Sequence, residues 1–129
     1  MKHLILIAIG GAVGALCRHG LVNIINRVNE DRESWSVFPI ATLSVNIIGS
    51  FCIGIMYVLI AEKLSLHPDW RSVAIVGFLG AFTTFSTFSL ETINLLENGQ
   101  LANALLYVVS SLIVCILAAW LAIVLTRMV

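Results

Sequence analysis

The sequence predicts an all-α integral membrane protein with four transmembrane helices, organised as a single membrane domain over residues 1–129. First, 60% of the residues are hydrophobic and 11% are charged, whereas a soluble domain is roughly half apolar and a quarter charged. Second, the mean hydropathy is +1.04. Third, four separate segments each approach the roughly 20 apolar residues that cross a bilayer. The formal net charge of zero gives no indication of a nucleic-acid partner.

The first predicted span covers residues 4–25 and contains Arg18 and His19. Its beginning, with Lys2 ahead of an apolar stretch, is also typical of a signal peptide. Because three more apolar segments follow, we expect it to remain as a membrane span. The guanidinium of Arg18 stays protonated in a protein, so it must either extend to lipid phosphate or attract anions at a vestibule. Both interpretations stay open.

The other three spans follow after short connections. They cover residues 37–61, 72–90 and 101–126, and the second and third contain no charged residue. The polar stretch 26–36 is expected to form a surface loop or a helix extension. Pro68 disfavours helix at the residue before it and marks a turn. Asn98 and Gly99 predict a tight turn before the fourth span.

The basic residues are distributed almost evenly between the two sides of the membrane. Four spans place both termini on one side, together with Lys2, Lys63, Arg71 and Arg127. Arg27 and Arg32 fall on the opposite side, and Arg18 lies nearer to that side than to the terminal side. Positive charge usually sets the orientation of a membrane protein. Either this small chain gives a noisy count, or it inserts in both orientations, which would let two copies pair antiparallel.

Polar side chains form a stripe on each of two spans, because they recur every four residues. The stripes are Thr42, Asn46 and Ser50 on the second span, and Tyr107, Ser111 and Cys115 on the fourth. A polar group in hydrocarbon must find a partner or face water. An amide such as Asn46 can therefore clamp two helices together or line a polar pathway.

The segment GFLGAFTTFSTFSLE, residues 77–91, combines two Gly, three Thr and two Ser in the third span. These are weak helix formers, and their clustering predicts a break in the helix at the middle of the membrane. Such a break frees carbonyls for a cation and creates a half-helix N-terminus that can face an anion. The edges of the Phe85 and Phe88 rings are positive and could hold a small anion, or the rings could pack against lipid or helices. Glu91 is either a solvated helix-end charge or a polar group beside a pathway.

This segment closely resembles the third-helix signature of the Fluc (CrcB) family of bacterial fluoride channels. GGAVGALCRHG resembles the first-helix pattern of that family, and PIATLSVNIIGSFCIGI resembles its second-helix motif. The match covers nearly the whole chain in order. It implies a fluoride-selective passive channel of the bacterial inner membrane that exports toxic fluoride from the cytoplasm. It also implies a dual-topology antiparallel homodimer with two ion pathways.

The resemblance further implies roles for individual residues. The fluoride pathway would comprise Asn46, Phe85, Phe88, Thr42, Ser86, Thr87, Glu91, Tyr107 and Ser111. Arg18 would lie near a vestibule, and the backbone carbonyls of Gly80 and Thr83 would hold a structural Na⁺ at the dimer centre. The sequence departs from the family pattern at Ala81, Phe82 and Cys115; Cys115 stands where some members have Ser.

Three other functions compete with a fluoride channel. A small proton-coupled multidrug or cation exporter also uses four short spans, but it needs a membrane-buried carboxylate, for which Glu91 is the one candidate near membrane depth. A non-transporting assembly subunit would show no ion flux alone. An enzyme is least supported, because the sequence shows no nucleophile paired with a base and no cluster of metal ligands.

Overall fold

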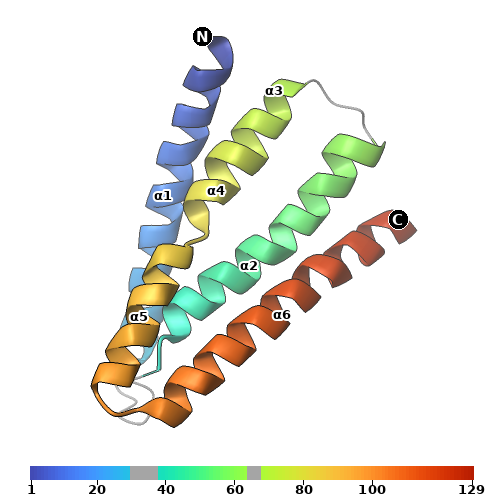
Figure 1. Cartoon of the computed structure of the whole chain (residues 1–129). Coiled ribbons are helices and arrows are strands. Elements are labelled where there is room, and N and C mark those ends of the chain that lie inside the picture. The colour runs from blue at the N-terminus through green and yellow to red at the C-terminus, as the bar shows by residue number, and fades with distance from the viewer. Residues whose placement is uncertain (30–37, 64–67) are drawn as a thin grey trace.

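The computed structural model describes residues 1–29, 38–63 and 68–129 (Figure 1). These residues are mostly helical, and they include four helical segments long and apolar enough to cross a membrane. The segments are Lys2–Asn29, Ile40–Lys63, Arg71–Glu97 and Leu101–Met128. The predicted four-span, all-α architecture is therefore confirmed, and the chain is a multi-pass membrane protein.

The first, second and fourth spans are long helices, whereas the third is built from several pieces. The first span is α1 (Lys2–Asn29), and the second is α2 (Ile40–Tyr57), continued by the π-helix η2 (Val58–Lys63). The third consists of the π-helix η3 (Arg71–Leu79), α4 (Gly80–Phe82) and α5 (Phe85–Glu97), and the short helix α3 (Pro68–Trp70) precedes it. The fourth is α6 (Leu101–Met128).

Two helices extend beyond the residues predicted from hydropathy. Helix α1 continues to Asn29, so the start of the polar stretch is a helix extension. Helix α5 continues to Glu97, past the predicted end at residue 90. Residues 30–36 of the predicted loop and the predicted turn at residue 67 lie outside the described residues. Pro68 begins α3, where its missing N–H removes no helical hydrogen bond.

A tight turn joins α5 to α6, as predicted. Gly99 adopts a positive φ of 72°, which a residue without Cβ tolerates. Its amide donates to the carbonyl of Leu96 at 3.0 Å, and the amide of Gln100 donates to that of Leu95 at 2.8 Å. These bonds satisfy the last carbonyls of α5 and reverse the chain.

The helices pack as two pairs that diverge toward the end holding both termini (Figure 1). Helix α1 packs along η3 and α4, and α2 packs along α6. At the terminal end, Lys2 Nζ lies 2.7 Å from Asp69 Oδ2. At the same end, Arg127 binds Glu62 through both guanidinium and carboxylate groups, at 2.6 and 2.9 Å. These ion pairs place Lys2 and Arg127 at one end of the protein, as the four-span topology predicts.

Glycines allow the close approach within each pair. A Cβ added to Gly10 would overlap the carbonyl oxygen of Val73 on η3. A Cβ added to Gly54 of α2 would meet the carbonyl oxygen of Ala119 on α6. Close backbone contact of this kind is typical of membrane helix interfaces. The pairs are therefore tightly packed, and the space available to a polar site lies between them.

Candidate functional site

The third span is broken at Thr83 and Thr84, inside the segment where the sequence predicts it. Thr83 (φ −82°, ψ 158°) and Thr84 (φ −149°, ψ 118°) are both extended. The Thr84 amide, which a continuous helix would direct to the carbonyl of Gly80, donates to Asn46 Oδ1 at 2.9 Å. The Thr87 amide, which would pair with the carbonyl of Thr83, donates to Thr84 Oγ1 at 3.2 Å. The carbonyls of Gly80 and Thr83 thus lose their helical donors.

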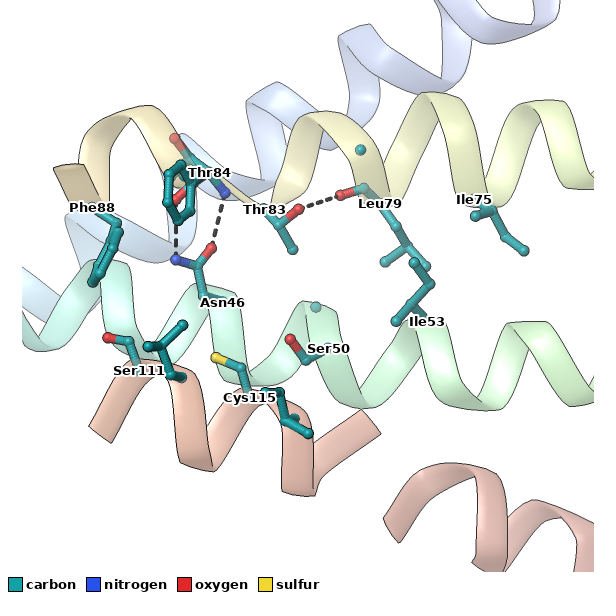
Figure 2. A pocket seen from close by; sticks show the side chains of 15 residues that line it. Asn46, Ser50, Ile53, Ile75, Leu79, Thr83, Thr84, Phe88, Ser111 and Cys115 are labelled. Carbon is teal, nitrogen blue, oxygen red and sulfur yellow. Dashed lines mark hydrogen bonds between the residues drawn. The ribbon is translucent and has the colours of Figure 1, made fainter. Parts of the chain in front are cut away.

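Asn46 of α2 binds both backbone polar groups of Thr84 (Figure 2). Its Oδ1 accepts from the Thr84 amide, and its Nδ2 donates to the Thr84 carbonyl at 3.1 Å. A side-chain amide has the donor and the acceptor that this pairing requires. Asn46 therefore joins α2 to the third span through the backbone of Thr84, and not through a second side chain. The second Nδ2 hydrogen has no partner among the described residues.

Thr84 also caps the N-terminus of α5. It is 8% exposed, and its hydroxyl donates to Thr87 Oγ1 at 3.0 Å while accepting from the Thr87 amide. The Ser86 hydroxyl oxygen lies 3.2 Å from Thr84 Oγ1. Side-chain oxygens at this position satisfy amides that the helix leaves without partners. Ser86 and Thr87 are exposed and contact the break, and they do not line the cavity beside it.

A cavity of about 340 Å³ lies between the third span, α2 and α6 (Figure 2). The predicted site residues that line it are Asn46, Gly80, Thr83, Phe85, Phe88 and Ser111. Further polar lining comes from Ser50, Thr84 and Cys115. Two residues of each polar stripe, Asn46 and Ser50 on α2 and Ser111 and Cys115 on α6, therefore face a common space next to the break, whereas Thr42 and Tyr107 do not line it.

The two predicted phenylalanines lie near one face of α5 and contact each other. Their ring centroids are 5.3 Å apart, with 43° between the ring planes. Phe88 is buried, and its ring centroid lies 5.1 Å from that of Tyr107. Phe85 is 74% exposed in the single chain. Phe88 is thus packed inside the chain, whereas Phe85 lies at its surface.

Glu91 of α5 is hydrogen-bonded to residues of both α2 and α6. Its Oε1 accepts from the hydroxyl of Thr42 at 2.8 Å, and its Oε2 accepts from that of Tyr107 at 2.7 Å. Thr42 and Tyr107 are buried, at 3% and 0% exposure, and Glu91 is half-buried. A carboxylate can remain at such a position when its oxygens are hydrogen-bonded. Glu91 is therefore held by α2 and α6, and it is not a freely solvated helix-end charge.

Arg18 is not brought into this site. It is half-buried on α1, has no hydrogen bond or ion pair with the parts of the chain that the structure describes, and does not line the cavity.

Phe82 and Gly49 pack at the break, and the sequence alone predicted a role for neither residue. Phe82 is buried and stacks on Phe78 with centroids 5.8 Å apart and planes 11° apart. A Cβ added to Gly49 would overlap the side chain of Thr83 and lie 3.2 Å from Phe82 Cδ1. The missing side chain at Gly49 lets the break approach α2 closely enough for Asn46 to bind it. A glycine three residues after a membrane-embedded Asn was the signal that could have indicated this contact.

Comparison with known proteins gives a consistent family assignment. The family model described as "CrcB-like protein, Camphor Resistance (CrcB)" matches residues 5–123. The "Fluoride-specific ion channel FluC" of Hahella chejuensis is 44% identical over 129 residues, which cover 100% of this chain and 98% of the relative. The protein of the same name from Saccharophagus degradans is 48% identical over 121 residues, covering 94% and 86%. That from Magnetococcus marinus is 43% identical over 125 residues, covering 95% and 96%.

Proposed function

The chain belongs to the CrcB-like family, and from this premise we propose that it is a fluoride-specific passive ion channel. The observation that carries the proposal is that Asn46, Phe88 and Ser111 line the same cavity beside a helix break. The similar proteins are named as channels, and the family is not one of enzymes.

The cavity offers a small anion neutral donors in place of its water shell. The second Nδ2 hydrogen of Asn46 and the hydroxyl of Ser111 have no partners among the residues that the structure describes. The rings of Phe85 and Phe88 add edges of positive potential. An ion channel must bind its ion strongly enough to admit it and weakly enough to release it. Donors without a full positive charge meet both requirements for fluoride.

We propose that two copies assemble antiparallel, with two fluoride pathways per dimer. Two observations support this arrangement: Phe85 is 74% exposed in one chain although it lines the cavity, and the basic residues are split almost evenly between the two sides. A second copy would cover Phe85 and complete the wall of the cavity. The dimer would lie in the bacterial inner membrane and export fluoride down its gradient.

We further propose that the carbonyls of Gly80 and Thr83 hold a structural Na⁺. Their helical donors, the amides of Thr84 and Thr87, are diverted to Asn46 Oδ1 and Thr84 Oγ1. Carbonyls of unwound membrane helices are suitable ligands for Na⁺. Bound between the breaks of two copies, Na⁺ would supply a fixed positive charge that keeps them together.

The remaining predicted residues would support the pathway in different ways. Thr42 and Tyr107 would hold Glu91 at the edge of the polar track, and Ser86 and Thr87 would stabilise the break. Arg18 would attract anions at a vestibule, since an unneutralised cation near a membrane surface raises the local anion concentration.

Ion flux from liposomes tests the proposed function. Purified protein is reconstituted with internal potassium fluoride or potassium chloride, and efflux is followed with ion-selective electrodes after addition of valinomycin. We expect electrogenic fluoride efflux and almost no chloride efflux. Equal rates for the two anions would refute fluoride selectivity, and pH-gradient-driven cation uptake without fluoride flux would support the exporter instead.

A matched pair of variants tests the pathway. Phe85→Ile should reduce fluoride efflux, because it removes an aromatic edge from the cavity wall. Phe78→Ile is the control, since Phe78 stacks on Phe82 and does not line the cavity. Unchanged efflux for Phe85→Ile would remove this ring from the pathway.

A further inference from the structure

Cys115 is a thiol in the wall of the cavity, one helical turn after Ser111 on α6. It is half-buried, and its sulfur lies toward α2 on the side of Ser50 (Figure 2). A thiol is a weaker hydrogen-bond donor than a hydroxyl, so Cys115 contributes less to a polar track than serine would. It adds a chemical property that serine lacks, because a thiolate is a nucleophile.

The neighbouring Ser111 indicates that this part of the cavity holds water or an ion. Ser111 is 7% exposed, and its Oγ has no hydrogen-bond partner among residues 1–29, 38–63 and 68–129. Buried polar groups nearly always have a partner, and a ligand or water supplies it where the protein does not. Because Cys115 lines the same space, a small reagent that enters the cavity can reach its sulfur.

The other two cysteines occupy different environments. Cys17 is exposed on α1, and Cys52 is half-buried on α2. Neither lines the cavity. The chain therefore contains its own controls for a property that depends on the cavity.

We propose that Cys115 is a covalent modification site at which a small thiol-reactive electrophile closes the ion pathway. The prediction that this modification stops ion flow rests on the channel function proposed above. With methyl methanethiosulfonate, the Cys115 thiol first releases its proton to solvent. The thiolate sulfur then attacks the methylthio sulfur of the reagent, a disulfide bond forms, and the reagent's sulfur–sulfur bond breaks. Methanesulfinate leaves with the electron pair of that bond, and no external oxidant is needed.

Close packing prevents the protein from making room for the added group. Cys115 faces Ser50 across the contact between α6 and α2. One turn further along α2, a Cβ on Gly54 would already overlap the carbonyl oxygen of Ala119. The two helices are thus held together beside the modified sulfur, and the methylthio group must project into the cavity.

Two cysteine variants in liposomes test this site. The double variant Cys17→Ser/Cys52→Ser keeps Cys115, and the single variant Cys115→Ser keeps the other two thiols. Each is compared with its own fluoride efflux before the reagent. We expect methyl methanethiosulfonate to slow efflux through the double variant at least about fivefold, because conduction requires an unobstructed path. Dithiothreitol should restore it, and efflux through Cys115→Ser should not respond.

Mass spectrometry of the labelled protein makes the result decisive. Labelling of Cys115 without loss of efflux, or failure to label Cys115 in the folded protein, would overturn the proposal. Equal inhibition of Cys115→Ser would also overturn it. Absence of fluoride efflux before the reagent would refute the proposed function instead, and labelling of the wild-type protein at Cys115 ahead of Cys52 would still support the modification site.

Discussion

Replacing Asn46 with aspartate tests the contact that holds the helix break. Aspartate has nearly the same shape as asparagine, but its ionised side chain only accepts hydrogen bonds. It can still accept from the Thr84 amide, now at 2.9 Å from Asn46 Oδ1. It cannot donate to the Thr84 carbonyl, which lies 3.1 Å from Asn46 Nδ2. The substitution therefore exchanges one hydrogen bond for a contact between two acceptors.

The size of the effect follows from that exchange. A buried group left without its partner costs about 1–3 kcal/mol, and hydrogen bonds between membrane helices average about 0.6 kcal/mol with a maximum of about 1.7 kcal/mol. We expect Asn46→Asp to lower the free energy of unfolding by about 1–3 kcal/mol, toward the upper end because the acceptors also repel. Fluoride efflux should fall as well, because the break loses its support from α2.

Unfolding in mixed micelles, followed as a function of the denaturing detergent fraction, measures this change. Asn29→Asp is the control, because Asn29 Nδ2 also donates to a backbone carbonyl, that of Ile25 at 2.9 Å, but within one helix. Acidification should partly rescue Asn46→Asp, since a protonated carboxyl regains a donor. Equal unfolding free energies for Asn46→Asp and Asn29→Asp, with no response to acid, would refute the reasoning.

Three further substitutions test the surroundings of the break. Gly49→Ala should lower the unfolding free energy by about 1–3 kcal/mol, because the added methyl overlaps the side chain of Thr83; wild-type stability in the same titration would contradict the close approach. Thr84→Val keeps the side-chain shape but removes the cap of α5, and should cost about 0.5–2 kcal/mol in unfolding free energy. An unchanged midpoint would show that the cap is dispensable. Tyr107→Phe removes one of the two hydroxyls bound to Glu91, and should cost about 1.5–3 kcal/mol. Stability and fluoride efflux equal to wild type would exclude a role for that bond.

The parts of the fold that could be predicted from the sequence depend on local properties. Four apolar segments predict four spans, because the bilayer imposes a minimum length on each. The cluster of glycine and threonine predicts the break, because weak helix formers act on their own segment. The ends of α1 and α5 were predicted less accurately, since helical hydrogen bonds continue into polar residues beyond the apolar stretch.

The contacts that shape the site could not be predicted, because they join distant residues. Asn46 could be expected to clamp a helix or line a pathway, but its partner, the backbone of Thr84, is 38 positions away. The position of Phe82 depends on Gly49, which lies on a different span. The antiparallel dimer, the Na⁺ and the two pathways stay predictions, since each depends on a second copy or a bound ion.

The pairing of Asn46 with Thr84 also has a consequence for biosynthesis. The chain is made from its N-terminus, so Asn46 leaves the ribosome 38 residues ahead of the group that it binds. At about 5–20 residues per second, this delay lasts roughly 2–8 seconds. During that time the second span must enter the membrane with an unpaired amide, and its largely apolar sequence provides the driving force. The arrival of the broken segment then completes an interaction between two helices that enter the bilayer one after the other.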